Sequence, residues 1–154
     1  MLKEGERAPY FKLMGIDERG EEREISIEEF RGRKVVLYFY PKDNTPGCTK
    51  EAISFRDNLV EIKKKGAVIV GISKDSIKSH KNFKNKYQLN FNLLSDPNCK
   101  IPEVYNVCVK KNRYGKTTKG IVRSTFIIDE EGIIRKVFYD VKVEGHVEEV
   151  LRYL

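Results

Sequence analysis

The chain has 154 residues, enough for one domain of ordinary size, and its hydrophobic share of 40% is enough for a packed core. We therefore expect a single domain over 1–154. The net charge of +7 is not accompanied by a nucleic-acid-binding motif, so we expect no nucleic-acid partner. No segment has the length and hydropathy of a membrane span, and the N-terminus lacks the apolar stretch of a signal peptide. We expect no membrane partner and a cytoplasmic location.

The first predicted elements are a β-hairpin and a short helical turn. Residues 10–14 favour a strand, 15–22 a turn and 23–25 a returning strand. Ser26, followed three residues later by a glutamate, has the capping-box pattern of a helix start. Gly32 is expected to end that turn.

A buried strand and the helix after it organise the rest of the chain. The unbroken apolar run over 35–40 is typical of a strand buried on both faces, and Pro41 ends it. Thr45 then has the position of a helix N-cap, with proline next at the first helical position. Apolar residues recur at helical spacing as far as Gly66, which predicts one continuous helix. Its buried face is expected to contain Cys48, Ala52, Phe55, Leu59 and Ile62.

The next segments continue the alternation of strands and helices. Residues 67–73 form a second apolar run, so strand, helix and strand predict a parallel pair with a right-handed crossover. Another helix is predicted to begin at 75–76, followed by a short strand over 91–94 and a short helix around Pro102.

The C-terminal third is expected to begin with a basic, solvated loop over 110–120. A hairpin formed by 123–128 and 133–139 follows, and a helix over 145–154 closes the chain. The succession predicts an α/β fold with a central mixed sheet.

Cys48 is placed in the first turn of a helix, at the carboxyl end of a central strand, where open α/β sheets bind ligands. Free amide groups and the positive end of the helix dipole favour a thiolate there. Lowering a thiol pKa from ~8.5 to about 6 takes roughly 3.4 kcal/mol, whereas a helix N-terminus supplies about 0.3–1, at most ~2. A nucleophilic Cys48 therefore needs a cation from elsewhere in the fold. The alternative is a buried structural thiol.

The residues around this cysteine resemble a known active site. The spacing of Pro41, Thr45 and Cys48 is similar to the peroxiredoxin motif Pro-x-x-x-Thr-x-x-Cys. The fuller run over 38–52 resembles the peroxiredoxin Q subfamily, also called bacterioferritin comigratory proteins. Further similar segments cover nearly the whole chain, at 93–97, 114–116, 120–129 and 145–151. The resemblance implies a thioredoxin-like three-layer sandwich with an added N-terminal β-hairpin.

The resemblance also implies a thiol-dependent peroxidase that needs no cofactor. Cys48 would attack hydrogen peroxide or an organic hydroperoxide and become a sulfenic acid. Arg123 would supply the missing cation, Thr45 a hydrogen bond to the sulfur or peroxide, Pro41 a shield against water, and Glu51 the orientation of the arginine. Three of these residues also have a plainer interpretation: a surface charge for the arginine, helix capping for the threonine, and a favourable helix-dipole contact for the glutamate.

The sequence departs from many peroxiredoxin Q proteins at Ile53, where those proteins carry a resolving cysteine. Three alternatives stay open: resolution by Cys99, resolution by Cys108, or a one-cysteine cycle in which an external thiol attacks the sulfenate. The expected reductant is a thioredoxin-like or glutaredoxin-like protein, and the expected assembly is a monomer or weak homodimer. His80 and His146 are expected at the surface, and no metal site is expected.

Two other function classes remain possible. A thioredoxin-like thiol–disulfide oxidoreductase is disfavoured, because Thr45 stands where such enzymes carry the first cysteine of Cys-x-x-Cys. The second is a non-catalytic binding or holdase module with the same fold. Peroxidase turnover that depends on Cys48 distinguishes the first hypothesis from both.

Overall fold

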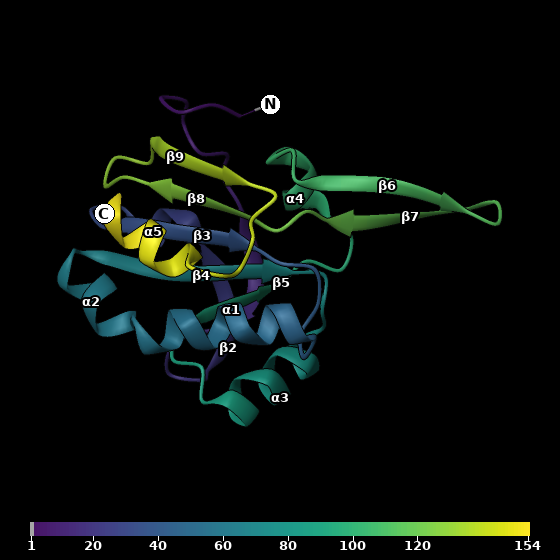
Figure 1. The fold of residues 1–154 in the computed structure, drawn as a ribbon, viewed down its shortest axis with the longest axis horizontal. Coiled ribbons are helices and arrows are strands. Elements are labelled where there is room, and N and C mark those ends of the chain that lie inside the picture. The colour runs from purple at the N-terminus through teal and green to yellow at the C-terminus, as the bar shows by residue number, and fades with distance from the viewer. Residues whose placement is uncertain (1) are drawn as a thin grey trace.

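The computed structural model describes residues 2–154 as a seven-stranded sheet covered on both faces, with a projecting two-stranded hairpin (Figure 1). The sheet has the order β2-β1-β5-β4-β3-β8-β9. Its strands are β1 (Lys12–Ile16), β2 (Glu22–Ser26), β3 (Lys34–Phe39), β4 (Ala67–Ser73), β5 (Asn92–Ser95), β8 (Ser124–Ile128) and β9 (Ile134–Tyr139). The helices are η1 (Ile27–Phe30), α1 (Pro46–Asp57), α2 (Leu59–Lys64), α3 (Ile77–Tyr87), α4 (Lys100–Val104) and α5 (His146–Arg152).

Strand pairing confirms the predicted mixed sheet. β3 and β4 run parallel in the register Lys34↔Ala67 to Phe39↔Ile72, and β5 continues the parallel set beside β4. β8 joins the other side of β3 antiparallel, and β9 pairs with β8. The N-terminal hairpin of β1 and β2 joins antiparallel beside β5, so it extends one edge of the sheet.

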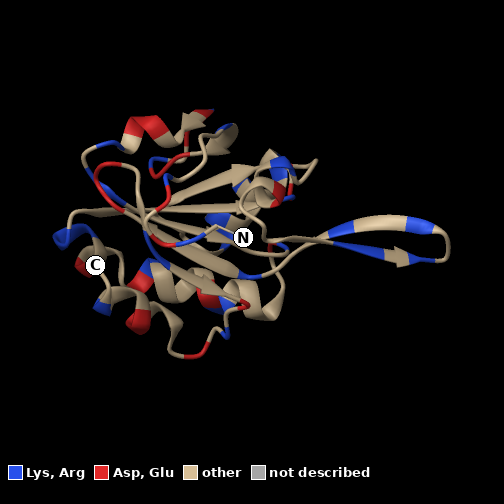
Figure 2. Cartoon of the chain, turned by 90° about the horizontal axis from the view of Figure 1, so that it is seen from above, with Lys and Arg blue, Asp and Glu red and all other residues tan. Residues whose placement is uncertain are grey.

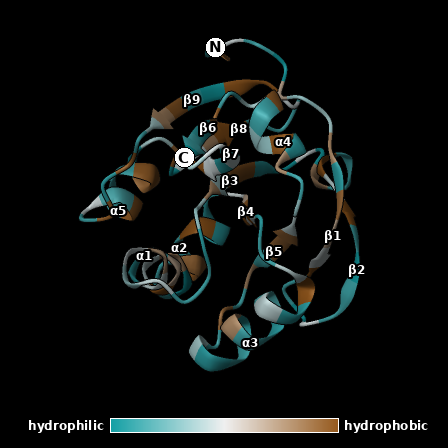
Figure 3. Cartoon of the chain, turned by 90° about the vertical axis from the view of Figure 1, so that its right-hand side faces the viewer, coloured by the Kyte–Doolittle hydropathy of each residue, from teal (hydrophilic) through white to brown (hydrophobic). Residues whose placement is uncertain are grey.

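Two hydrophobic cores lie on opposite faces of the sheet, because side chains alternate along each strand. Val36, Tyr38 and Tyr40 belong to the core beneath α1, α2, α3 and α5. Val35, Leu37 and Phe39 belong to the other core, which η1 and α4 cover. Figure 3 looks along the layers and shows α1, α2, α3 and α5 on one side of the sheet and α4 on the other. We call these the α1 face and the α4 face.

The predicted continuous helix over 46–66 is wrong in one respect, because it breaks at Asn58 between α1 and α2. The side-chain amide of Asn58 donates to the carbonyl of Ser54 at 2.8 Å. An asparagine that bonds its own backbone in this way competes with helix continuation. The predicted apolar stripe is nevertheless confirmed, since Cys48, Ala52, Phe55, Leu59 and Ile62 are all buried.

The predicted basic loop over 110–120 is also wrong. This segment forms the antiparallel hairpin of β6 (Cys108–Arg113) and β7 (Lys116–Ile121), in the register Cys108↔Ile121 to Arg113↔Lys116. Tyr114 and Gly115 make the turn, with φ values of 52° and 75°, as a two-residue hairpin turn requires. Polar residues occupy both faces of the segment 110–119, which is not buried in a core, so the alternation of polar and apolar residues that indicates a strand is absent there. Figure 2 shows lysines and arginines along both strands of this projecting arm.

No helix among residues 2–154 is long and apolar enough to cross a membrane.

Candidate active site

Cys48 lies in the first turn of α1, and its side chain is buried on the α1 face at 2% exposure. The residue before the proline is extended, with Thr45 at φ −85° and ψ 154°, as the residue preceding a proline favours. Thr45 therefore stands at the N-cap, but its hydroxyl makes no capping bond. Instead, Oγ1 donates to the carbonyl of Lys42 at 2.8 Å. The loop after β3 is tied to the helix start in this way.

The cation that the sequence analysis predicted near Cys48, Arg123, lies in contact with the sulfur. Nη2 of Arg123 is 3.3 Å from Sγ of Cys48, although the two residues are 75 positions apart. Arg123 lies between β7 and β8, and its side chain is 15% exposed. Because β8 pairs with β3, the sheet brings the start of β8 next to the helix that follows β3. The plainer interpretation of Arg123 as a surface charge is thereby excluded.

Glu51 holds the other edge of the guanidinium. Its Oε1 accepts from Nη1 of Arg123 at 2.7 Å, and its side chain is 1% exposed. The glutamate is three residues after Cys48, so both side chains lie on one face of the helix. Arg123 thus bridges the thiol and the carboxylate.

The carboxylate is buried at an electrostatic cost. Burial raises the pKa of Glu51 to about 7, although Arg123 acts in the opposite direction. Oε2 of Glu51 has no hydrogen-bond partner among the described residues, and neither has the buried hydroxyl of Tyr38. Burial would lower the pKa of Arg123, but Glu51 and Cys48 outweigh it and raise that pKa. The guanidinium stays charged in a mostly buried site, where electrostatic interactions are stronger than in water.

Gly47 is a site residue that sequence reasoning missed. A Cβ atom at this position would lie 3.2 Å from Nη2 of Arg123, tighter than an ordinary contact. The absent side chain lets the guanidinium approach the first turn of α1. The available signal was a glycine in a helical first turn, where its low helix propensity is unfavourable.

Pro41 is exposed at the end of β3, and its shielding role stays a prediction. Cys99 and Cys108 do not join the site. Cys99 belongs to the core of the α4 face and Cys108 packs against that core, whereas Cys48 belongs to the core of the α1 face. The sheet lies between them.

The surface prediction for the two histidines is wrong, because both rings are buried. His80 is 0% exposed and bridges the loop after β3 to β5, with Nδ1 2.8 Å from Asp43 and Nε2 2.9 Å from the carbonyl of Leu94. His146 is 3% exposed, and its Nε2 is 2.8 Å from the hydroxyl of Thr125. Burial lowers the pKa of His146 to about 4. Both rings lie on helix faces that pack against the sheet, which a lone histidine in a polar sequence does not reveal.

One cluster of side chains has the spacing of a possible metal site, since ligand atoms of Asp43, Asp75 and His80 lie within 4.8 Å of one another. Each carboxylate already accepts hydrogen bonds from the protein. Asp43 accepts from the hydroxyls of Tyr40 and Ser79 at 2.6 and 2.7 Å. Asp75 accepts from the hydroxyl of Ser73 at 2.6 Å and from the amide of Asp43 at 2.8 Å. The cluster is a hydrogen-bond network that holds the loop leading to α1.

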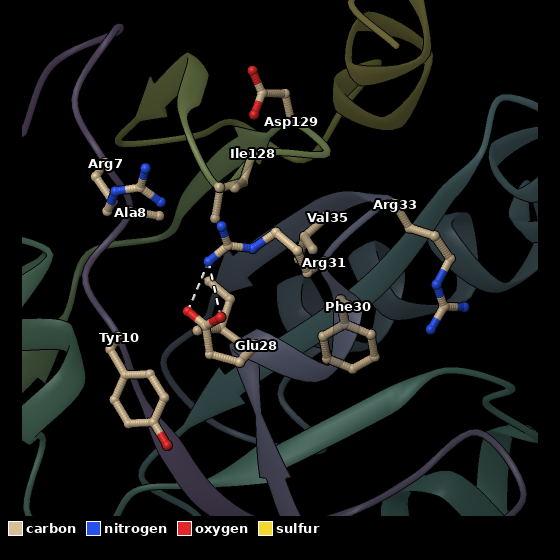
Figure 4. A pocket seen from close by; sticks show the side chains of 12 residues that line it. Arg7, Ala8, Tyr10, Glu28, Phe30, Arg31, Arg33, Val35, Ile128 and Asp129 are labelled. Atoms are coloured by element: carbon tan, nitrogen blue, oxygen red, sulfur yellow. Dashed lines mark hydrogen bonds and ion pairs between the residues drawn. The ribbon is translucent and has the colours of Figure 1, made fainter.

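A separate small cavity of about 90 Å³ lies near the N-terminal segment and η1 (Figure 4). Its charged groups are largely paired: Arg31 contacts Glu28 at 2.8 and 2.9 Å, and both Arg7 and Arg31 donate to the carbonyl of Glu131. None of the predicted site residues lines it.

A buried cysteine at the start of the helix after a central strand, with a guanidinium on its sulfur, defines a class: the thioredoxin-fold thiol peroxidases. Comparison with known proteins agrees. The chain belongs to the AhpC/TSA family, whose profile matches residues 5–137.

Similar proteins share nearly the full length. A peroxiredoxin bcp of Coxiella burnetii is 53% identical over 150 residues, covering 97% of each chain. Peroxiredoxin Bcp of Escherichia coli is 43% identical over 153 residues, covering 99% of this chain and 96% of its own. Among solved structures, a cysteine-to-serine mutant of Xanthomonas campestris peroxiredoxin Q superposes with a TM-score of 0.84 at 39% identity, over 92% of this chain and 87% of its own.

These findings confirm the predicted family, the thioredoxin-like fold and the enzyme class. The protein is a peroxiredoxin, a thiol-dependent peroxidase. The thioredoxin-like disulfide oxidoreductase is the less supported alternative.

Proposed function

We propose that Cys48 is the peroxidatic nucleophile and that the enzyme reduces hydrogen peroxide and alkyl hydroperoxides. The observation that carries this proposal is the guanidinium of Arg123, 3.3 Å from the buried sulfur. Two unit charges at that separation attract by about 5 kcal/mol at an effective dielectric constant of about 20. Such an attraction favours the charged form of the sulfur in the site and offsets part of the cost of burying that charge. A related Xanthomonas campestris bacterioferritin comigratory protein is described by its alkyl peroxide reduction activity.

The reaction is a displacement at oxygen. The Cys48 thiolate attacks one oxygen of the hydroperoxide, the S–O bond forms and the O–O bond breaks. The departing oxygen takes a proton and leaves as water or an alcohol, and Cys48 becomes a sulfenic acid. Arg123 stabilises the thiolate first and then the charge that develops on the peroxide oxygens. Its planar donors suit both tasks, because Nη1 is held by Glu51 while Nη2 faces the sulfur.

Thr45 and Pro41 complete the proposed site. The hydroxyl of Thr45 donates a hydrogen bond to the carbonyl of Lys42. The hydroxyl oxygen therefore keeps lone pairs that can accept a hydrogen bond from an incoming hydroperoxide. Pro41 restricts water at the mouth of the site. Glu51 is a positioning residue, since it contacts Arg123 and not the reacting atoms.

We propose a one-cysteine cycle, in which a thiol of a thioredoxin-like or glutaredoxin-like protein attacks the Cys48 sulfenate. The support is the placement of Cys99 and Cys108 in and against the core of the opposite face of the sheet. Sulfurs must approach to about 2 Å to form a disulfide, and the sheet separates these residues from Cys48. The enzyme acts in the cytoplasm, as a monomer or weak homodimer.

The decisive test is peroxide consumption by Cys48→Ser protein in the presence of a thioredoxin system. We expect turnover to fall to the uncatalysed background, and Cys108→Ser to retain it. Trapping with a sulfenate-specific reagent after one equivalent of peroxide should label Cys48. Retained turnover in Cys48→Ser protein, or a Cys48–Cys99 or Cys48–Cys108 bridge in place of the trapped sulfenate, contradicts the proposal.

A further inference from the structure

Two cysteines outside the peroxidase site face each other at the base of the β6–β7 hairpin. Cys99 is the N-cap of α4, and Cys108 is the first residue of β6. Their sulfur atoms are 3.0 Å apart, with the thiol of Cys99 donating to Cys108. Cys99 is 0% exposed, whereas Cys108 is half-buried.

Both backbones are fixed by their neighbours. The amide of Cys99 donates to the carbonyl of Asp96 at 3.0 Å, and Cys108 is paired with Ile121 in the hairpin ladder. Cys99 has φ 58°, a left-handed conformation that asparagine or glycine adopts more readily than cysteine. A disulfide requires sulfurs about 2.05 Å apart, so closure needs an approach of about 1 Å. The sulfurs already face each other, so the pair is close to the separation that a disulfide needs.

The two thiols are chemically unequal. Burial, together with the contact to Cys108, raises the pKa of Cys99 to about 12, so Cys99 keeps its proton. Two lysines lie beside the pair. The charge of Lys74 acts on Cys99, and its ammonium donates to the carbonyl of Lys119 at 2.7 Å. The pKa of Lys119 is raised chiefly by its ion pair with Glu103, and both thiols act in the same direction. Because Cys108 is half-buried and Cys99 is fully buried, Cys108 is the sulfur that an incoming reagent can reach first.

We propose that Cys99 and Cys108 form a second redox centre, a dithiol–disulfide couple that exchanges with disulfides of small thiols or of proteins. The Cys108 thiolate attacks one sulfur of the incoming disulfide, a mixed disulfide forms, and the first thiolate leaves. Cys99 then gives up its proton, attacks Cys108, closes the intramolecular bond and releases the second thiol. The chain loses two electrons and two protons, and the incoming disulfide gains them.

The groups around each sulfur indicate that the Cys99–Cys108 pair reacts with disulfides and not with peroxides. Arg123 is committed to Cys48 and Glu51 on the opposite face, so it cannot polarise a peroxide at Cys108. Disulfide exchange needs only an accessible thiolate and a nearby resolving thiol. The inference does not rest on the peroxidase role of Cys48, because the pair is complete without it.

The test uses full-length Cys48→Ser protein, which removes the peroxidase thiol. Reduced protein is incubated with oxidised glutathione, alkylated, digested and analysed by mass spectrometry. We expect both thiols to become protected from alkylation, peptides joined through Cys99 and Cys108, and one oxidised glutathione consumed for each chain. Reduction by dithiothreitol should restore both thiols.

Two matched variants assign the roles. Cys48→Ser/Cys99→Ser protein should accumulate one glutathione on Cys108, because no resolving thiol remains. Cys48→Ser/Cys108→Ser protein should stay unmodified while folded, because Cys99 is buried. Thermal melting checks that each variant is folded, and Cys99→Ala replaces Cys99→Ser if the serine variant is not.

Three results overturn the proposal. Cys48→Ser protein could retain both free thiols, could stop as a glutathione adduct on Cys108, or could form disulfides only between chains. Equal modification of Cys99 in Cys48→Ser/Cys108→Ser protein overturns the assigned order of attack.

Discussion

The two faces of the sheet hold the same functional group in two different settings. Cys48 and Cys99 are nearly equally buried, at 2% and 0% exposure. Cys48 has a guanidinium as its nearest polar partner, whereas Cys99 has another thiol. Burial raises a thiol pKa, and a nearby cation acts in the opposite direction. Equal burial therefore leaves the sulfur of Cys48 beside a fixed positive charge on the α1 face, and the thiol of Cys99, whose pKa is raised to about 12, beside another thiol on the α4 face.

Among substitutions of the residues around the Cys48 sulfur, the largest expected effect comes from removing the positive charge of Arg123. Arg123→Gln should lower kcat/KM for hydrogen peroxide by about 10²–10³-fold, the range for loss of a charge-stabilising donor at the reacting atoms. Stopped-flow measurement of sulfenate formation reports this step directly. Arg135→Gln is the matched control, since Arg135 pairs with Asp129 at an exposed position. A loss below tenfold for Arg123→Gln would remove the distinction between the two faces.

The Cys48 side also holds two buried groups whose ionisation affects stability in opposite directions. Because folding raises the pKa of Glu51 to about 7, the native state binds the extra proton and stability falls as pH rises from about 4.5 to about 7. Folding lowers the pKa of His146 to about 4, so its contribution falls as pH drops from about 6.5 to about 4. Each contribution is on the order of 3 kcal/mol.

Chemical denaturation across pH 4.5–7 separates the two contributions. Glu51→Gln should remove the loss toward neutral pH, and His146→Gln, which can keep the bond to Thr125, should remove the loss toward acid pH. Each variant is the control for the other. Parallel pH profiles for both variants and the parent protein would contradict the assignment.

A smaller loss of kcat/KM is expected when the position of the Arg123 guanidinium is changed and its charge is kept. Gly47→Ala places a methyl group 3.2 Å from Nη2 of Arg123, so the guanidinium must shift by a few tenths of an ångström from its position beside the sulfur. We expect kcat/KM to fall about tenfold while the melting temperature changes little, because alanine is favourable in a helix. Gly120→Ala is the matched control, since its Cβ would have its nearest neighbour at 4.0 Å. Equal activity of Gly47→Ala and the parent protein would mean that the close approach is unimportant.

The smallest expected effect on peroxidase activity comes from a substitution on the α4 face. Cys108→Ser should change peroxidase turnover by less than about twofold, because the sheet separates it from Cys48. Steady-state peroxide consumption with thioredoxin as reductant measures this, with Cys48→Ser as the inactive reference. A tenfold loss would link the two faces in one catalytic cycle.

Local pattern in the sequence was sufficient for much of the fold. The apolar run over 35–40, the Thr45-Pro46 helix start and the stripe from Cys48 to Ile62 appear in the structure, because period and helix-end chemistry are properties of neighbouring residues. Arg123 and Glu51 entered through family resemblance. Nothing near Arg123 in the chain indicates a partner 75 residues away.

Tertiary structure alone decided which groups meet. The pairing of β3 with β8 brings Arg123 to Cys48, and the β6–β7 hairpin places Cys108 against Cys99. It also buried His80 and His146, which the sequence placed at the surface. Residue types and spacings determine which elements form, but contacts between distant segments depend on strand order and on which face each side chain occupies. For this reason the sequence by itself predicts a reactive cysteine, whereas only the folded sheet shows which groups surround each sulfur.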